Sequence, residues 1–294
     1  MSLDPGFRIK SVQCLSPSGL HSMAYKEWGD PGNPRVLVCV HGLTRVSDDF
    51  DVLAQELARH YRVVCPDVVG RGRSDWLANP MHYQIPQYVS DMVVLLARLD
   101  AQQVDWVGSS MGGLIGMGIA SLKGNPLHKL VLVDVGPALD VEALTRITAY
   151  MQESPRFADF EQAAHYVQSI SAPFGPHDAQ QWRKLAADVL RQDSDGSWIR
   201  HYDPGLAQPL QAQGMEVLRQ SEALLWAAYD AIRCPTLVLR GELSDLLSRE
   251  TAQAMRERGP RASVVEVAGV GHVPTLVHAD QIALVRDFLL NQET

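Results

Sequence analysis

The sequence predicts an α/β fold built on a mostly parallel sheet with helices on both faces, and two observations lead to this prediction. Short, continuously apolar runs, which are typical of strands buried on both faces of a parallel sheet, alternate with segments of helical periodicity. The alternation is interrupted once, by a stretch from about residue 137 to residue 231 without apolar strand runs, and then resumes. The sequence therefore predicts a core of residues 1–136 and 232–294, with a helical cap at 137–231 inserted in it.

The N-terminal part is expected to contribute most of the sheet. Two strands, at 7–15 and 21–28, flank the turn 16–19, whose Ser, Pro and Gly residues predict an antiparallel hairpin at a sheet edge. Four short strands rich in apolar residues are expected to follow, at 35–40, 61–66, 103–107 and 130–135, of which 35–40 is the continuously apolar one. Apolar residues at helical spacing predict helices between these strands, at 50–60, 86–99 and 113–120.

The C-terminal part repeats the alternation after the insertion. Strands are expected at 236–241 and 263–267, and helices at 248–258 and 280–290, with Ser248 as the N-cap of the first helix. Within the insertion, the Pro- and Gly-containing segments 171–176 and 203–205 divide the chain into helical pieces.

The composition is that of a soluble globular enzyme. Of the 294 residues, 46% are hydrophobic and 20% are charged, so the chain is long enough for one large domain with an insertion. The formal net charge is −8 and no run of Lys and Arg is present, so we expect no nucleic-acid partner. We also expect no membrane contact, because no run of 18 apolar residues occurs and an acidic chain is not attracted to anionic lipids.

The cysteine pattern favours free thiols. Cys14, Cys39, Cys65 and Cys234 show no C-x-x-C spacing, so buried thiols in a reducing compartment are favoured over a metal or redox site. Residues 1–8 do not combine a basic segment with an apolar stretch, so no secretory signal is expected. We therefore expect a cytoplasmic protein without a bound metal.

The segment Gly108-Ser109-Ser110-Met111-Gly112 matches G-x-S-x-G, in which a nucleophilic serine lies on a sharp turn between a strand and a helix. The strand and the helix expected on either side provide the context that this motif requires. The two glycines remove Cβ atoms that would clash in so tight a turn. Ser110, at the central position, is therefore the predicted nucleophile, and Ser109 is the alternative.

A nucleophilic serine needs an adjacent base, and the base needs an acid that orients it. His272 follows the last expected strand after two glycines and is the predicted base. Asp245 follows the strand 236–241 and is the predicted acid, because it gives the chain order serine, acid, histidine at the carboxyl ends of parallel strands. Asp134, which ends an earlier strand, and Glu242 are the alternatives. Asp245 is preferred to Asp134 because Gly136-Pro137 and the insertion follow Asp134 at once.

Two backbone N–H groups are expected to stabilise the oxyanion of the tetrahedral intermediate. One belongs to Met111, the residue after the nucleophile, and the other to Leu43 in the loop that follows the strand 35–40. His41 begins this loop, so we interpret it as part of the oxyanion loop and not as the base.

Together these segments resemble the α/β-hydrolase superfamily, in particular its serine hydrolases with a helical cap. The resemblance covers most of the chain outside the insertion and is carried by the segments 41–44, 67–74, 108–112, 241–245 and 269–272. It implies a central sheet of eight strands, a cap at about 137–231, and a turn shaped by Asp67 without a role in the chemistry. Such relatives include small-molecule carboxylesterases, enol-lactonases and C–C bond hydrolases, and some bacterial ones cleave short hydroxyalkanoate oligomers.

The resemblance also narrows the function. Haloalkane dehalogenases and epoxide hydrolases of this fold use an aspartate nucleophile, so Ser110 disfavours both. Charged residues in the cap, such as Glu161 and Lys184, favour a soluble substrate over a lipid droplet. We therefore expect a Ser-His-Asp carboxylic ester hydrolase that cleaves a small soluble ester through an acyl-enzyme, without a cofactor. The ester could bear an acid group, as a hydroxyalkanoate oligomer or a lactone does.

Arg45 and Trp226 are the candidate substrate-binding residues. Arg45 directly follows the oxyanion loop, where it either holds a substrate carboxylate or forms an ion pair with Asp48, Asp49 or Asp67. Trp226 lies near the end of the predicted cap and is a candidate for the pocket wall.

Two other functions stay open at this point. A C–C bond hydrolase of a vinylogous diketone would use the same serine, histidine and acid, so these residues cannot separate it from an esterase. A non-enzymatic ligand sensor would keep the pocket but release no product. The sequence also leaves the oligomeric state open between a monomer and a homodimer.

Overall fold

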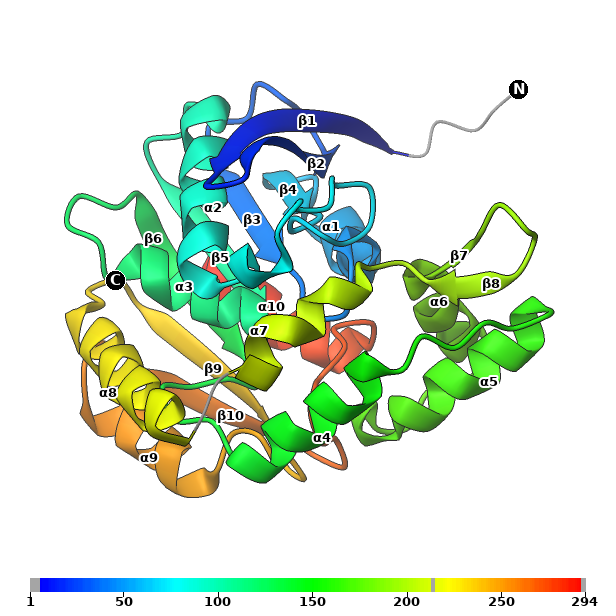
Figure 1. Ribbon diagram of the computed structural model, residues 1–294. Helices are drawn as coiled ribbons and strands as arrows, with labels where there is room; N and C mark the ends of the chain where they lie inside the picture. Colours follow the sequence, from blue (N-terminus) through cyan, green and yellow to red (C-terminus); the bar gives the residue numbers. More distant parts are fainter. Residues whose placement is uncertain (1–5, 213–214, 292–294) are drawn as a thin grey trace.

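The computed structural model describes residues 6–212 and 215–291, apart from the side chains of 215–220. An eight-stranded sheet with helices on both faces runs through the molecule (Figure 1). Its strand order is β1 (Phe7–Ser16), β2 (Gly19–Trp28), β4 (Arg62–Pro66), β3 (Val36–Val40), β5 (Val104–Ser109), β6 (Leu127–Val133), β9 (Thr236–Gly241) and β10 (Ser263–Val267). β2 is antiparallel to both of its neighbours, and every pair from β4 to β10 is parallel. The predicted α/β fold with a mostly parallel sheet is confirmed.

Successive side chains of the central strands enter two different apolar cores. Val36, Val38 and Val40 of β3 belong to one cluster, whereas Leu37 and Cys39 belong to the other, and each of the five is at most 2% exposed. Because both faces of the sheet are covered, this strand is a continuous apolar run and does not alternate with polar residues.

The helices divide between the two faces of the sheet. The cluster that contains Val38 receives α2 (Ile85–Leu99), α3 (Met111–Ala120), α8 (Met215–Ala231) and α9 (Arg249–Glu257), and the opposite cluster receives α1 (Asp51–Leu57) and α10 (Ala279–Leu290). Helix α9 is capped as expected, because the Ser248 side chain accepts a hydrogen bond from the N–H of Thr251.

The predicted insertion contains helices and one small hairpin. Its elements are α4 (Val141–Gln152), α5 (Phe160–Ile170), η3 (Ala172–Phe174), α6 (Ala179–Val189), β7 (Leu190–Gln192), β8 (Trp198–Arg200), η4 (Pro204–Leu206) and α7 (Ala207–Ala212). Helices α5 and α6 lie beside the β7–β8 hairpin, to one side of the main sheet (Figure 1). The sequence predicted no strand in this region, since strands of three residues are too short to show a period.

Helix α8 falls inside the predicted insertion but packs on the core. It lies against α3, and its Tyr229 side chain is buried in the same cluster as the sheet residues. The Tyr229 hydroxyl donates a hydrogen bond to the carbonyl oxygen of Met255 in α9, at 2.7 Å. The chain has therefore returned to the core before residue 232, and the division into core and cap at that residue stays a prediction.

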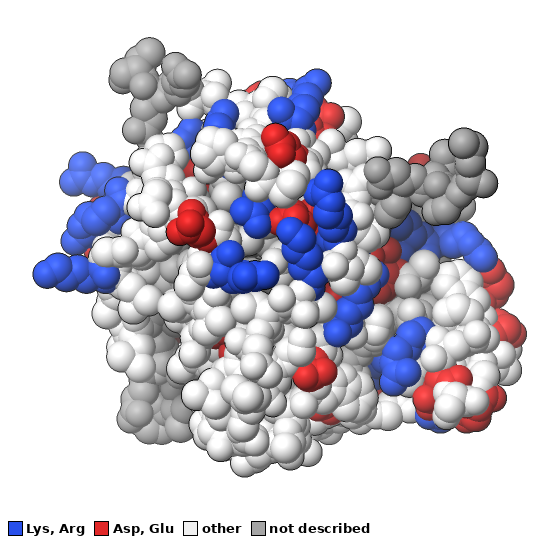
Figure 2. Space-filling view, turned by 90° about the horizontal axis from the view of Figure 1, so that it is seen from above, with Lys and Arg blue, Asp and Glu red and all other residues white. Residues whose placement is uncertain are grey.

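Charges of both signs share the surface. Figure 2 shows one face of the molecule, on which Lys and Arg side chains are interspersed with Asp and Glu side chains. Ion pairs of the molecule include Arg73 with Asp48, at 2.7 Å, and Arg258 with Asp230, at 2.5 Å. Within the described residues, none of the helices has the length and hydropathy needed to span a bilayer.

Candidate active site

Ser110 lies on a strained turn between β5 and α3. Its backbone has a φ of 49° and a ψ of −113°, and a positive φ is rare for residues other than glycine. A Cβ atom at Gly108 would collide with the carbonyl of Gly112, and a Cβ atom at Gly112 would collide with the carbonyl of Val40. Both glycines of the motif are therefore needed for the turn to approach the sheet this closely.

Three side chains form a continuous chain of hydrogen bonds at this turn. Ser110 Oγ lies 3.0 Å from His272 Nε2, and His272 Nδ1 lies 2.7 Å from Asp134 Oδ2. A carboxylate can only accept, so Nδ1 donates to Asp134 and the Nε2 atom of the neutral ring is free to accept the Ser110 proton. This is the arrangement of a nucleophile, a base and an orienting acid.

Asp134 is held in this position by several donors. It follows β6 with a positive φ of 53°, and its side chain is fully buried. Its Oδ1 accepts a hydrogen bond from the backbone N–H of Gly241 at 2.8 Å, and its Oδ2 accepts from the hydroxyl of Ser244 at 2.6 Å. Gly241 is the last residue of the neighbouring strand β9 and Ser244 lies in the loop that follows it, so this strand end and its loop fix the carboxylate beside His272.

The structure corrects the acid predicted from the sequence. Asp245 makes no hydrogen bond with His272 in the described part of the chain; its side chain is 44% exposed and pairs with Arg146 of α4. Burial acts to raise the pKa of Asp245, but the hydrogen bond and the charge of Arg146 outweigh burial and hold this pKa below its ordinary value. Asp134, the alternative weighed from the sequence, occupies the position expected of Asp245.

Glu242, the other alternative acid, has a contact of its own. Its Oε2 accepts a hydrogen bond from the backbone N–H of Gly269 at 2.8 Å. Gly269 lies three residues before His272, so this contact supports the loop that carries the imidazole.

The backbone around Leu43 and Met111 fits the expected oxyanion donors. Met111 is the first residue of α3, where a backbone N–H has no acceptor within the helix. A Cβ atom added to Gly42 would lie 3.7 Å from the Cβ of Ser110, so the loop before Leu43 lies directly beside the nucleophile. The carbonyl oxygen of Leu43 accepts a hydrogen bond from Nε of the buried Arg71 at 2.9 Å, which fixes this loop.

His41 supports the same loop from within the core. Its Nε2 lies 2.9 Å from the backbone nitrogen of Val68, and because an N–H can only donate, Nε2 accepts. The proton of the ring is therefore on Nδ1, which donates to the carbonyl oxygen of Gly42 at 2.7 Å. Burial lowers the pKa of His41 to about 4, so the ring is neutral at pH 7. These contacts agree with the interpretation of His41 as part of the oxyanion loop.

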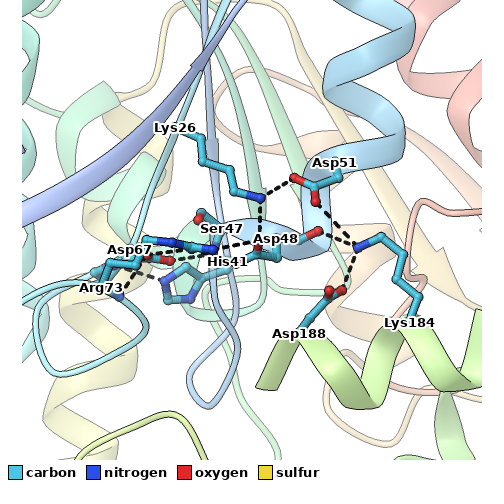
Figure 3. Close-up of polar contacts among 10 residues, drawn as sticks. Lys26, His41, Ser47, Asp48, Asp51, Asp67, Arg73, Lys184 and Asp188 are labelled. Atoms are coloured by element: carbon cyan, nitrogen blue, oxygen red, sulfur yellow. Dashed lines mark hydrogen bonds and ion pairs between the residues drawn. The ribbon is translucent and has the colours of Figure 1, made fainter. Parts of the chain in front are cut away.

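Asp67 stabilises the adjoining turn (Figure 3). Its Oδ1 accepts from the backbone N–H of Ser47 at 2.7 Å, and its Oδ2 accepts from the backbone N–H of Arg73 at 3.0 Å. Gly72, with a φ of 53°, leaves no room for a Cβ beside this carboxylate. The contacts agree with the shaping role that the resemblance implied for Asp67.

A cluster of charged residues ties the insertion to the core (Figure 3). Lys184 of α6 donates to Asp188 Oδ2 at 2.7 Å and to the backbone carbonyl oxygen of Asp48 at 2.9 Å. Asp48 lies in η1 (Ser47–Phe50) of the core, where its carboxylate pairs with Lys26 of β2. This cluster therefore anchors α6 beside the oxyanion loop.

Arg45 forms an ion pair with Asp49, which is one of the two roles that the sequence predicted for it. Its guanidinium makes two hydrogen bonds with Asp49, from Nε at 2.8 Å and from a terminal nitrogen at 2.5 Å. The same terminal nitrogen donates to the carbonyl oxygen of Leu185 in α6 at 3.2 Å. Arg45 also lines the cavity described next, but its charge is already balanced by Asp49.

An open cavity lies between the insertion and His272, with about 630 Å³ of space that includes the solvent at its mouth. Its wall combines apolar side chains with several basic and hydroxyl-bearing ones. The lining residues are Thr44, Arg45, Arg146, Ile147, Tyr150, Val167, Ile170, Ser171, Pro173, Phe174, Val189, Arg200, Tyr202 and His272. Among the described residues that line it, three are arginines and none is acidic. The cavity therefore favours a neutral or anionic ligand.

Trp226, the other predicted substrate-binding residue, lies elsewhere. Its ring stacks with the guanidinium of Arg258, 4.0 Å from the ring centroid, and meets the Tyr229 ring edge to face. It is not among the described residues that line the cavity beside His272. These contacts give no support to a substrate-binding role for Trp226, which stays a prediction.

One group outside the site has the residue types of a metal centre. Cys14, His21 and Asp91 are buried between the β1–β2 hairpin and α2, with their potential ligand atoms within 4.8 Å of one another. His21 Nε2 lies 3.0 Å from Asp91 Oδ2. Burial first, and then the charge of Asp91, raise the pKa of Cys14 to about 12, which favours a protonated thiol over the thiolate that binds metals. The four cysteines are free thiols, as the sequence predicted.

Comparison with known proteins gives a consistent result. Residues 37–284 match the family described as "Alpha/beta hydrolase family". The chain is 55% identical to a 3-hydroxybutyrate-oligomer hydrolase of Cupriavidus necator, over 98% of this chain and 99% of that one. It is 24% identical to a 2-(acetamidomethylene)succinate hydrolase of Mesorhizobium japonicum, over 83% of each chain. A solved structure of an alpha/beta hydrolase from Novosphingobium aromaticivorans superposes with a TM-score of 0.84 at 34% identity, covering 97% of this chain and 98% of that one.

Proposed function

Because the chain belongs to the alpha/beta hydrolase family, we propose that it is a serine hydrolase that cleaves short oligomers of 3-hydroxyalkanoic acids at their ester bonds. The observation that carries this proposal is the hydrogen-bonded chain from Ser110 through His272 to Asp134, which meets a cavity lined by arginines. The full-length likeness to the C. necator hydrolase supports the choice of substrate.

In the proposed reaction, Ser110 Oγ attacks the carbonyl carbon of the ester while His272 Nε2 takes the hydroxyl proton. The imidazolium that forms is stabilised by the Asp134 carboxylate, 2.7 Å from Nδ1. The backbone N–H groups of Leu43 and Met111 would hold the oxyanion, and each such donor contributes roughly 3 kcal/mol to lowering the barrier.

Collapse of the tetrahedral intermediate breaks the ester C–O bond and leaves an acyl group on Ser110. His272 gives its proton to the departing alkoxide, so the first product leaves as a hydroxy acid with a newly formed hydroxyl group. A water molecule, deprotonated by His272, then attacks the acyl-enzyme and releases the second product as a carboxylic acid. The cycle balances without a cofactor, because only water is consumed.

The test is the release of 3-hydroxybutyrate from its dimer and trimer by the wild type and by Ser110→Ala, followed by chromatography. We expect turnover by the wild type and a loss of at least about 10⁴-fold in kcat for Ser110→Ala. Ser109→Ala is the matched control, because Ser109 lies at the end of β5 before the turn, and it should keep most of the activity.

Two results would contradict this proposal. If the wild type hydrolyses a dienoic diketone but neither the dimer nor simple esters, the chain is a C–C bond hydrolase that uses the same residues. If ligands bind and no product forms with any ester or diketone, the chain is a ligand sensor.

A further inference from the structure

The three arginines that line the cavity differ in how their charges are balanced. Arg45 is paired with Asp49, and Arg146 is paired with Asp245. Arg200, at the end of β8, has no carboxylate within 4.0 Å among the residues that the structure describes. Arg200 is nevertheless buried, with only 8% of its surface exposed, as little as Arg45.

The contacts that Arg200 does make leave its charge largely uncompensated. Its guanidinium donates to the backbone carbonyl oxygens of Tyr150, at 2.7 Å, and of Met151, at 3.5 Å. These carbonyls lie in the last turn of α4, where the helix carries only a partial negative charge. A buried guanidinium is normally paired with a full anion, because the loss of hydration is otherwise costly.

A second unsatisfied group lies next to Arg200. The Tyr202 ring is stacked on the Arg200 guanidinium, 4.8 Å from the ring centroid, and both residues line the cavity. Tyr202 is 5% exposed, and its buried hydroxyl has no hydrogen-bond partner. Buried hydroxyl groups are almost always hydrogen-bonded, so this one is a donor without an acceptor. Burial raises the pKa of Tyr202, which keeps the hydroxyl protonated and able to donate.

We propose that Arg200 and Tyr202 form a carboxylate-binding subsite of the cavity, which holds the free acid end of the substrate. A carboxylate would supply the full negative charge that Arg200 lacks and the acceptor that the Tyr202 hydroxyl lacks. This inference rests on the proposed function for the identity of the acid, but the two unsatisfied groups are observed independently of it.

The chemistry of a hydroxyalkanoate oligomer fixes the direction in which it would bind. At every ester bond, the acyl side carries the free hydroxyl end of the chain and the alcohol side carries the free carboxylate end. A carboxylate held by Arg200 and Tyr202 therefore belongs to the leaving group, and the acyl group on Ser110 belongs to the hydroxyl end. The cavity would then receive the hydroxy acid released first, so that short oligomers are shortened from their carboxyl ends.

The subsite is also fixed relative to the core. The backbone N–H of Gly72 donates to the carbonyl oxygen of His201 at 3.0 Å, and the N–H of Asp203 donates to the carbonyl oxygen of Gly70 at 2.8 Å. Tyr202 thus lies in a short bridge to the turn that supports the oxyanion loop. This connection holds the carboxylate site at a set distance from Ser110, as selection by substrate length requires.

The test compares the 3-hydroxybutyrate dimer with its methyl ester, which has the same scissile bond but no carboxylate. For Arg200→Gln we expect kcat/KM on the free acid to fall about 10- to 100-fold, the range for losing a charge-assisted hydrogen bond, while the methyl ester is little affected. Arg191→Gln is the matched control, since Arg191 lies on the paired strand of the same hairpin and is not among the described residues that line the cavity. It should preserve the ratio of the two substrates.

Tyr202→Phe provides a test that does not depend on Arg200. Removal of a hydroxyl without a partner should leave Tm unchanged or higher, whereas KM for the free acid should rise several-fold and KM for the methyl ester should not. If Arg200→Gln does not fold, this variant alone decides the question. A parallel loss on acid and methyl ester in Tyr202→Phe, or no loss on either, would overturn the subsite.

A binding experiment separates failure of the subsite from failure of the proposed function. The 3-hydroxybutyrate anion should inhibit hydrolysis of p-nitrophenyl butyrate competitively in the wild type, and at least about 10-fold more weakly in Tyr202→Phe or Arg200→Gln. This result would support the subsite even if oligomers are not turned over. Equal inhibition of the wild type and both variants would refute it even if oligomers are cleaved.

Discussion

The two aspartates near His272 lead to a prediction that separates their roles. In Asp134→Asn, the side-chain atom that replaces Oδ1 still faces the backbone N–H of Gly241, so the amide oxygen must occupy this position. The amide nitrogen then takes the place of Oδ2 and points at His272 Nδ1, which it can only approach as a donor. The imidazole is therefore forced into the tautomer with its proton on Nε2, where it cannot accept the proton of Ser110.

The expected size of this effect follows from the geometry. An imidazole in the wrong tautomer lowers kcat by about 10⁴-fold, which corresponds to about 5 kcal/mol of transition-state stabilisation. Asp245→Asn breaks only an exposed ion pair with Arg146, and such pairs contribute about 0–1 kcal/mol, or at most about fivefold in rate. The two substitutions are chemically identical, so each serves as the control of the other.

The assay is the steady-state hydrolysis of p-nitrophenyl butyrate, with thermal melting of both variants as the check on folding. A drop in kcat confined to Asp134→Asn would support the hydrogen-bonded chain. If Asp245→Asn lost about 10⁴-fold while Asp134→Asn kept its activity, the acid predicted from the sequence would be the functional one and the reasoning from the geometry would be refuted.

Three further predictions follow from the supports of the site. The pKa of His41 is about 4 in the folded state and 6.5 ordinarily, so between these pH values only the unfolded chain gains the proton. The free energy of unfolding should therefore fall by about 3 kcal/mol from pH 7 to pH 4. In urea titrations, His41→Gln should remove this part of the pH dependence. Gly112→Ala would drive a Cβ into the carbonyl of Val40 and should lower the free energy of unfolding by more than about 3 kcal/mol in the same titrations. A small change would contradict this prediction and show that the turn can shift. Ser244→Ala removes one donor to Asp134 and should lower kcat about 10-fold at unchanged KM, so an effect on KM alone would place Ser244 outside the chemistry.

The features predicted correctly from the sequence are those that depend on neighbouring residues. The nucleophile turn was predictable because a local five-residue pattern marks it, although the Cβ excluded at Gly112 would strike the carbonyl of Val40 on the neighbouring strand β3. The buried strands were predictable because both of their faces meet helices, which leaves no polar alternation. The expected location in the cytoplasm and the absence of nucleic-acid and membrane partners stay predictions.

The acid was not predictable, because it depends on the contact between two strands. Asp134 and Asp245 both follow apolar strands, β6 and β9, which are neighbours in the sheet, so both reach the same edge. The choice is made by the positive φ at Asp134 and by the donors Gly241, at the end of the adjacent strand, and Ser244, in the loop after it, and no local pattern encodes either. One signal in the sequence was that Asp134 directly follows an apolar run, whereas Asp245 lies in a loop after the strand 236–241.

The position of Asp245 has a consequence for the charge of the cavity. Its pairing with Arg146 joins α4 of the insertion to the β9 loop at the cavity wall, and removes one of three positive charges that a substrate could meet. Asp49 removes a second charge by pairing with Arg45. Arg146 joins the insertion to the core through its ion pair with Asp245, whereas Arg45 reaches the insertion through a hydrogen bond to the carbonyl oxygen of Leu185. Arg200 is left as the cavity arginine that no carboxylate balances among the described residues. In the proposed subsite, the charge that binds the substrate would therefore be separate from the contacts of Arg45 and Arg146 that join the insertion to the core.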